Sequence, residues 1–219
     1  MTPPMTLAEE VMLLSLDDEK GDAKEPSRVQ WAVAGAMVVD LALAGRIDVE
    51  DERVHVRDPS PVGVPYLDAE LADLAERGEA PKVKKVIEHA RKTGVKGARQ
   101  SLIDRGLVRE EKKKVLGIFS VSRYPEADGA AERELRDRLE AVVEHGRSPD
   151  ERTAALVALL HGARLRKLAF GGGDRRRTET RMKEIAEGQW VSPAVRRAVD
   201  GAEAAMVAVI TTTTIAATG

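Results

Sequence analysis

One segment constrains the fold more than any other. Residues 31–44 contain a single charged residue, Asp40, and their apolar side chains fall on every side of a helical projection. A helix that is apolar all round is typically buried, and this run is shorter than the roughly 20 residues that a membrane span needs. The chain is therefore predicted to pack around a central buried helix that ends at Gly45, in a left-handed conformation.

Capping signals predict where other helices begin. Thr6 followed by Glu9 forms a capping box, in which each residue satisfies a backbone N–H of the other. Ser27 followed by Gln30 predicts a second box ahead of the central helix. Two Ser-Pro pairs are predicted to open helices, with proline at the first helical position: residues 148–149 and 192–193.

Apolar spacing predicts the remaining helices, including a second central helix whose residues are apolar almost throughout. Gly94 and Gly97 are expected to weaken one of the amphipathic helices. The predicted helices cover residues 67–77, 81–106, 135–143, 154–160 and 202–217.

Two short segments alternate in a way that predicts β-hairpins. Residues 47–49 and 54–56 flank an acidic turn, and the basic run 109–114 leads into apolar residues 115–121. We therefore expect a mainly α protein, with a buried central helical bundle, surrounding amphipathic helices and two small β-hairpins. A single domain is expected over residues 1–219.

Several classes of site lack support in the sequence. The chain has no cysteine, which excludes disulfide frameworks, thiolate metal sites and cysteine nucleophiles. The four histidines share no ligand spacing, so no metal site is expected. Gly171–Gly173 predicts a turn rather than a phosphate loop, because no strand precedes it and no Gly-Lys-Ser/Thr follows. We expect no cofactor and no enzymatic activity, and expect Asp40 to be tied to an arginine or a backbone group.

A cytoplasmic protein is expected. Met1–Pro4 leads directly into the acidic pair Glu9 and Glu10, which is unlike a signal peptide.

The charge of the chain is distributed unevenly, although its formal net value is only -2. Residues 82–114 hold twelve basic and four acidic side chains, and residues 164–183 hold eight basic and two acidic ones. The remainder is correspondingly acidic. Such polarity favours one surface that attracts anions, although charged helices also serve solubility alone.

The larger basic block runs into the second hairpin, and this combination suits a membrane surface. The cations of residues 112–114 would meet anionic headgroups while the apolar residues Leu116, Ile118 and Phe119 enter the acyl boundary. The alternative is an ordinary strand packed on the domain, and composition does not separate the two.

Two other interpretations use the same residues. A basic helix followed by a hairpin also describes a winged helix, in which the helix enters the major groove of DNA. Gly94 and Gly97 within that helix, and the acidic remainder of the chain, count against it. The third interpretation is a protein–protein adaptor, or a homo-oligomer, that uses the hairpin against protein.

Five segments, taken in order, resemble the Golgi phosphoprotein 3 family in its bacterial branch. Each is weakly diagnostic, but their shared order along nearly the whole chain is fairly specific. They are Thr6–Leu14 with Asp17–Gly21, Val38–Arg46, Leu102–Val108, Leu116–Phe119 with Arg123–Pro125, and Arg152–His161.

The resemblance implies a mostly helical domain that associates peripherally with membranes through a phosphoinositide headgroup, with an inserting hairpin. In eukaryotic members that headgroup is phosphatidylinositol 4-phosphate, bound by a tryptophan and three arginines. Those positions fall near Glu25, at Ala34, at Lys92 and near Val95 of this chain, so only a lysine is retained. We expect no counterpart of the basic N-terminal tail with which eukaryotic members engage coats and enzyme tails.

The best-supported expectation is a noncatalytic lipid binder on the cytoplasmic face of a membrane. Lys92, Lys96 and Arg99 would lie near an anionic lipid headgroup, and Leu116, Ile118 and Phe119 would form the inserting tip. Client membrane enzymes and a homo-oligomer formed through the hairpin are further expected partners. Nucleic acid is not expected.

Overall fold

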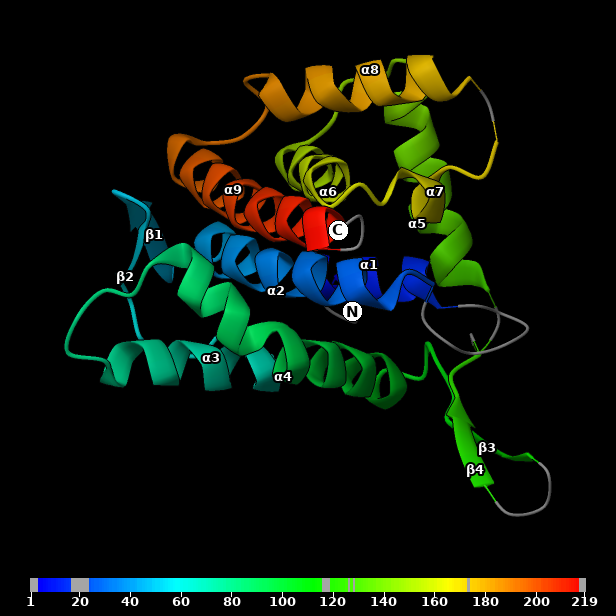
Figure 1. Ribbon diagram of the computed structural model, residues 1–219, viewed down its shortest axis with the longest axis horizontal. Helices are drawn as coiled ribbons and strands as arrows, with labels where there is room; N and C mark the ends of the chain where they lie inside the picture. The colour runs from blue at the N-terminus through cyan, green and yellow to red at the C-terminus, as the bar shows by residue number, and fades with distance from the viewer. Residues whose placement is uncertain are drawn as a thin grey trace.

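The computed structural model describes residues 4–16, 24–115, 119–125, 127, 129–172 and 174–216, without the side chains of residues 112–123 and 209–216. The mainly α class and the two hairpins are confirmed (Figure 1). The helices are α1 Leu7–Ser15, α2 Pro26–Leu43, α3 Pro65–Glu76, α4 Val83–Asp104, α5 Ala130–Val143, α6 Glu151–Gly162, α7 Arg166–Ala169, α8 Arg175–Glu187 and α9 Pro193–Ala216. The strands are β1 Ile47–Glu50, β2 Arg53–Val56, β3 Glu111–Val115 and β4 Phe119–Arg123.

The predicted central helix is α2, and it contacts α1, α4, α6 and α9. In Figure 1, α2 and α9 run through the middle of the molecule, with α4 on one side and α8 on the other. Residues 31–42 are buried throughout, as their uniformly apolar character predicted. The buried apolar side chains form one cluster that extends from Leu7 to Met206.

The ends of α2 bear out one prediction and overturn another. Gly45 has a φ of 67°, so it ends the helix in the left-handed conformation as expected. The helix, however, begins at Pro26, and the Ser27 capping box does not form. Glu25 is the N-cap residue, in a left-handed conformation with a φ of 51°. A proline at N1 already has helical φ, and because it has no backbone N–H it needs no acceptor there, so the start of α2 shifts ahead of the serine.

The buried carboxylate of Asp40 organises the start of α1. Its two oxygens accept hydrogen bonds from the backbone N–H groups of Leu7 and Ala8, at 2.8 and 3.1 Å. The predicted capping box of Thr6 and Glu9 is also present. The free N–H groups of the first turn of α1 are thus satisfied by its own cap and by a residue of the central helix.

Two further carboxylates of α1 are buried against arginines from other helices. Glu9 pairs with Arg105 at 2.9 Å, and Glu10 pairs with Arg138 of α5 at 2.9 Å. Arg152 of α6 reaches both Glu10, at 3.5 Å, and Asp40, at 3.6 Å. It also donates a hydrogen bond to the Met5 carbonyl. The ion pairs of Glu9 and Glu10 fasten α1 to three parts of the chain, namely the end of α4, α5 and α6.

One predicted cap differs in detail, and a further cap has no predicted counterpart. Asp150, rather than a Ser-Pro pair, caps α6, and its side chain accepts from the Thr153 N–H. Asp174 caps α8 and accepts from the N–H groups of Arg176 and Arg177. An aspartate at the last position before the helix competes better for these N–H groups than the more distant serine. Helix α9 starts at Pro193, as the second Ser-Pro pair predicted.

The glycines of α4 do not interrupt the helix, which spans both of them as the helix predicted over residues 81–106 does. The helix is continuous over 22 residues, and both glycines lie where a neighbouring helix approaches closely. A Cβ at Gly97 would lie 2.3 Å from the Cβ of Tyr66 on α3, and one at Gly94 would lie 2.5 Å from the sulfur of Met37 on α2.

Gly97→Ala is expected to lower the free energy of unfolding by about 1–3 kcal/mol, because the obstructing atoms are the rigid base of an aromatic side chain. Gly94→Ala is the matched control. Its close contact is with the flexible end of Met37, its 3.5 Å approach to Val33 is an ordinary one, and it gains helix propensity, so we expect a change within about 1 kcal/mol. Urea denaturation of both variants measures this. Equal losses would contradict the close α3–α4 packing at Gly97.

Candidate functional site

The three residues predicted to bind a headgroup share one stripe of α4. Lys92 and Lys96 are one turn apart and exposed, and Arg99 follows at the next turn and is half-buried. Residues at this spacing lie on the same face of a helix. Neither lysine has an ion-pair partner among the described residues. The stripe runs along α4 toward the end from which the second hairpin emerges (Figure 1).

Arg99 has a structural contact that the sequence did not reveal. Its guanidinium lies over the ring of Tyr124, 4.2 Å from the centroid, and Tyr124 directly follows β4. Backbone hydrogen bonds close the base of the hairpin, from Arg109 to Pro125 and from Ala127 to Leu107, both 2.9 Å long. Arg99 therefore connects the basic stripe to the hairpin, and a cation–π contact of this kind orients the charge without neutralising it.

A second arginine–aromatic pair lies nearby. The guanidinium of Arg91 is 4.7 Å from the centre of the Trp31 ring, so α4 and α2 are joined by another cation–π contact. Trp31 is only 7% exposed, which confirms its expected place in the core. Sixty residues separate the two partners, and no local pattern in the sequence marks such a pair.

The second hairpin projects from the helical body beyond the end of α4 (Figure 1). Its register pairs Val115 with Phe119 and Lys113 with Val121, and the run 112–114 forms part of β3. Of the predicted inserting residues, Leu116 and Ile118 lie outside the described residues. Phe119 begins β4, and its side chain also lies outside the description.

Two clefts are found elsewhere, and none of the three stripe residues lines either one. A cleft of about 800 Å³ lies between the start of α1, the end of α4 and helix α5. Another, of about 850 Å³, is lined by parts of α2, α6, α7, α8 and α9. Within the described ranges there is no cluster of side chains suited to a metal ion, and no helix with the length and apolarity to cross a membrane.

Comparison with known proteins identifies the family. The model of the Golgi phosphoprotein 3 (GPP34) family matches residues 7–202. The chain belongs to this family. It is 26% identical to the vacuolar protein sorting-associated protein 74 of Eremothecium gossypii over 171 residues, which cover 64% of this chain and 50% of that protein. The protein of the same name from Schizosaccharomyces pombe is 26% identical over 166 residues, covering 64% of this chain and 49% of its own. The chain thus spans about half the length of these curated relatives.

The Golgi phosphoprotein 3 resemblance inferred from the ordered segments is thereby confirmed. The residues at the four positions that it implies for headgroup binding, however, differ from the tryptophan and three arginines of the eukaryotic members. Ala34 is fully buried and apolar, and Val95 is half-buried. Glu25 is an acidic N-cap, ion-paired with Arg28 at 2.7 Å. Of the four positions only Lys92 offers an exposed cation. An aromatic and an arginine do stand close together at Trp31 and Arg91, but the tryptophan is buried.

Proposed function

We propose that this Golgi phosphoprotein 3 family chain is a noncatalytic protein that binds anionic lipid headgroups peripherally, at the cytoplasmic face of a membrane. The observation that carries the proposal is the exposed stripe of Lys92 and Lys96 on α4, continued by Arg99 to the base of a projecting hairpin. An exposed row of unpaired cations on a rigid helix suits a planar, negatively charged surface better than an enclosed ligand.

Other lysines of α4 are less available for such a surface. Lys84 and Lys85 share the carboxylate of Glu88, at 4.0 and 3.1 Å. Lys92 and Lys96 have no such competitor in the described parts of the chain. The unneutralised charge of α4 therefore lies toward the hairpin, which would bring lipid-facing cations and apolar residues together.

Lys92→Ala/Lys96→Ala is expected to weaken binding to anionic vesicles about 30-fold. Each lysine near an anionic leaflet contributes about 1 kcal/mol, and about 1.4 kcal/mol corresponds to a tenfold change. Flotation with vesicles of phosphatidylcholine, alone or with phosphatidylserine or phosphatidylinositol 4-phosphate, measures this. Arg176→Ala/Arg177→Ala, which removes two exposed charges from α8, is the matched control and should leave flotation unchanged.

Triple replacement of Leu116, Ile118 and Phe119 by serine distinguishes insertion of the hairpin tip from headgroup binding by the α4 lysines in the same assay. If the hairpin tip inserts, this variant floats less while keeping the wild-type dependence on salt, whereas the lysine variant loses that dependence. Wild-type binding by the double-lysine variant would refute the α4 site. Failure of the wild-type chain to bind any anionic vesicle would refute the function.

A further inference from the structure

The second basic block of the sequence surrounds a cleft that the membrane proposal does not use. The cleft has a volume of about 850 Å³ and lies between α6, α7, α8, α9 and the start of α2. Figure 1 shows α8 and α4 on opposite sides of α2 and α9, and neither lysine of the stripe lines the cleft. Six cationic side chains line it: Arg28, Arg164, Arg166, Lys167, Arg175 and Lys183.

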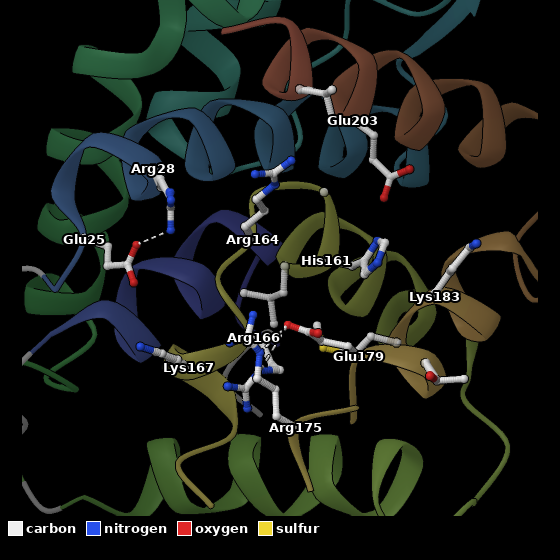
Figure 2. A pocket seen from close by; sticks show the side chains of 15 residues that line it. Glu25, Arg28, His161, Arg164, Arg166, Lys167, Arg175, Glu179, Lys183 and Glu203 are labelled. Atoms are coloured by element: carbon white, nitrogen blue, oxygen red, sulfur yellow. Dashed lines mark hydrogen bonds and ion pairs between the residues drawn. The ribbon is translucent and has the colours of Figure 1, made fainter. Parts of the chain in front are cut away.

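The carboxylates of the cleft do not balance these cations. Glu25 is paired with Arg28, and Glu179 lies 3.2 Å from Arg175 and 3.8 Å from Arg166 (Figure 2). Glu203 stands apart from them, beside His161. Arg164 and Lys167 have no carboxylate partner in the part of the chain that the structure describes. The cleft is therefore positively charged.

Arg164 occupies a backbone position that normally belongs to glycine. Its N–H donates to the His161 carbonyl and the N–H of Leu165 donates to the Leu160 carbonyl, at 2.9 and 2.8 Å, which is the Schellman pattern at the end of α6. The residue at this position has a φ of 56°. A left-handed conformation is unfavourable for a residue with a Cβ, so an arginine here costs stability that glycine would not. Strain of this kind is concentrated at functional sites.

The shape and chemistry of the lining indicate the class of ligand. Pockets for small molecules commonly enclose about 300–1,000 Å³. Guanidinium groups form paired hydrogen bonds with phosphate oxygens, and several of them around one space match a doubly charged group. We propose that this cleft is a second anion site, which binds a phosphomonoester through Arg164, Arg166 and Lys167. The ester is either a lipid headgroup or a free small molecule.

Glu203 gives the site a dependence on pH. Burial raises the pKa of Glu203 to about 7, with a further increase from Asp200 and an opposing effect of Arg196 on the same helix. From the packed helices it faces Glu187 and Lys183 of α8 and His161 of α6, and burial lowers the pKa of that histidine. At pH 8 Glu203 is therefore mostly ionised and repels an anion in the cleft, and at pH 6 it is mostly protonated.

Arg164→Gly tests the site without endangering the fold. The substitution relieves the left-handed strain, so the variant is expected to melt at a higher temperature than the wild type while binding glycerol 3-phosphate about tenfold more weakly. Titration calorimetry of the full chain at pH 6 and low salt measures the affinity. Arg177→Ala, a matched loss of one exposed charge on α8 outside the cleft, should bind as the wild type does.

Glu203→Gln is expected to raise the affinity for the phosphomonoester, which is the opposite of the effect of Arg164→Gly. It removes the negative charge from the cleft, so glycerol 3-phosphate should bind several-fold more tightly than to the wild type at pH 8 and about equally at pH 6. An improvement of this kind cannot result from loss of structure.

Vesicles containing phosphatidic acid, tested with Arg164→Gly in the Lys92→Ala/Lys96→Ala background, distinguish the two sources of the ester. Binding of free glycerol 3-phosphate that depends on Arg164, without an effect on vesicles, identifies a small-molecule ligand. Vesicle binding that depends on Arg164, without binding of the free ester, identifies a lipid headgroup. If neither probe binds, or if Arg164→Gly leaves both affinities unchanged, the site does not exist.

Discussion

Arg152→Ala is expected to lower the free energy of unfolding by about 3–5 kcal/mol at pH 8. The arginine is the only cation within 4 Å of the Asp40 carboxylate among the described residues, and it also approaches Glu10. Without the arginine the buried Asp40 carboxylate keeps its two backbone donors but has no opposite charge, and breaking a buried ion pair in this way typically costs that amount. Loss of its hydrogen bond to the Met5 carbonyl would further loosen the segment before α1. Urea denaturation at pH 8 measures the change.

Arg147→Ala is the matched control for this prediction. Arg147 is exposed and lines the 800 Å³ cleft near α5, as Glu10 does, so its loss should change the free energy of unfolding by no more than about 0.5 kcal/mol. Glu10 keeps Arg138 in the Arg152 variant. If the two variants are equally stable, the Asp40–Arg152–Glu10 cluster has no role in holding α1.

Asp40 should make the stability of the protein fall as the pH rises from about 4 to about 7. Burial raises the pKa of its carboxyl from 3.8 to about 7, against the opposing effects of the Leu7 and Ala8 N–H groups and of Arg152. Between these two values the unfolded chain loses the proton while the folded chain keeps it, so the unfolded state is favoured increasingly. Linkage gives a total loss of about 4 kcal/mol, which is complete above pH 7 and absent below pH 4.

Comparison of the wild type with the Asp40→Asn variant isolates the contribution of Asp40 to the pH dependence of the free energy of unfolding. The amide cannot ionise, so the gap between the two stability curves should change by about 4 kcal/mol from pH 4 to pH 7.5, while the shared effects of other carboxyls cancel. The variant itself is less stable at low pH, because its NH₂ group faces a backbone donor of α1. In the Arg152→Ala background the wild-type Asp40 should keep its proton to a higher pH. Parallel stability curves for the wild type and the Asp40→Asn variant would contradict the raised pKa.

The sequence predicted the features that depend on neighbours in the chain. The buried position of α2 followed from its uniformly apolar character, and Gly45 and the Thr6–Glu9 box followed from local capping chemistry. The first hairpin was also expected, and its turn residues Asp51 and Glu52 both adopt positive φ, as a tight hairpin turn requires. Such features need only a few consecutive residues to be specified.

The features that the sequence did not predict depend on residues that are far apart in the chain and come into contact only in the folded protein. The partners of Asp40 were expected in kind, an arginine and backbone groups, but nothing identified Leu7, Ala8 or Arg152. The roles of Gly94 and Gly97 in close packing could not be separated from their poor helix propensity. The basic block 164–183 was visible as charge, yet its cleft also requires Arg28, from α2, and Glu203, from α9.

The position of α1 has a consequence for the order in which the protein is made. A nine-residue helix is too short to be stable alone, and the carboxylates of Glu9 and Glu10 cannot be buried until their arginines exist. Those arginines lie up to 142 residues further along the chain than Glu10. On the ribosome α1 emerges before α5 and α6, so the ion pairs of Glu10 with Arg138 and Arg152 can form only after both of those helices have been synthesised. Until then α1 can pack only on α2 and α4, while the Glu10 carboxylate still lacks its arginines, and incompletely packed apolar surface of this kind is what makes folding intermediates prone to aggregation.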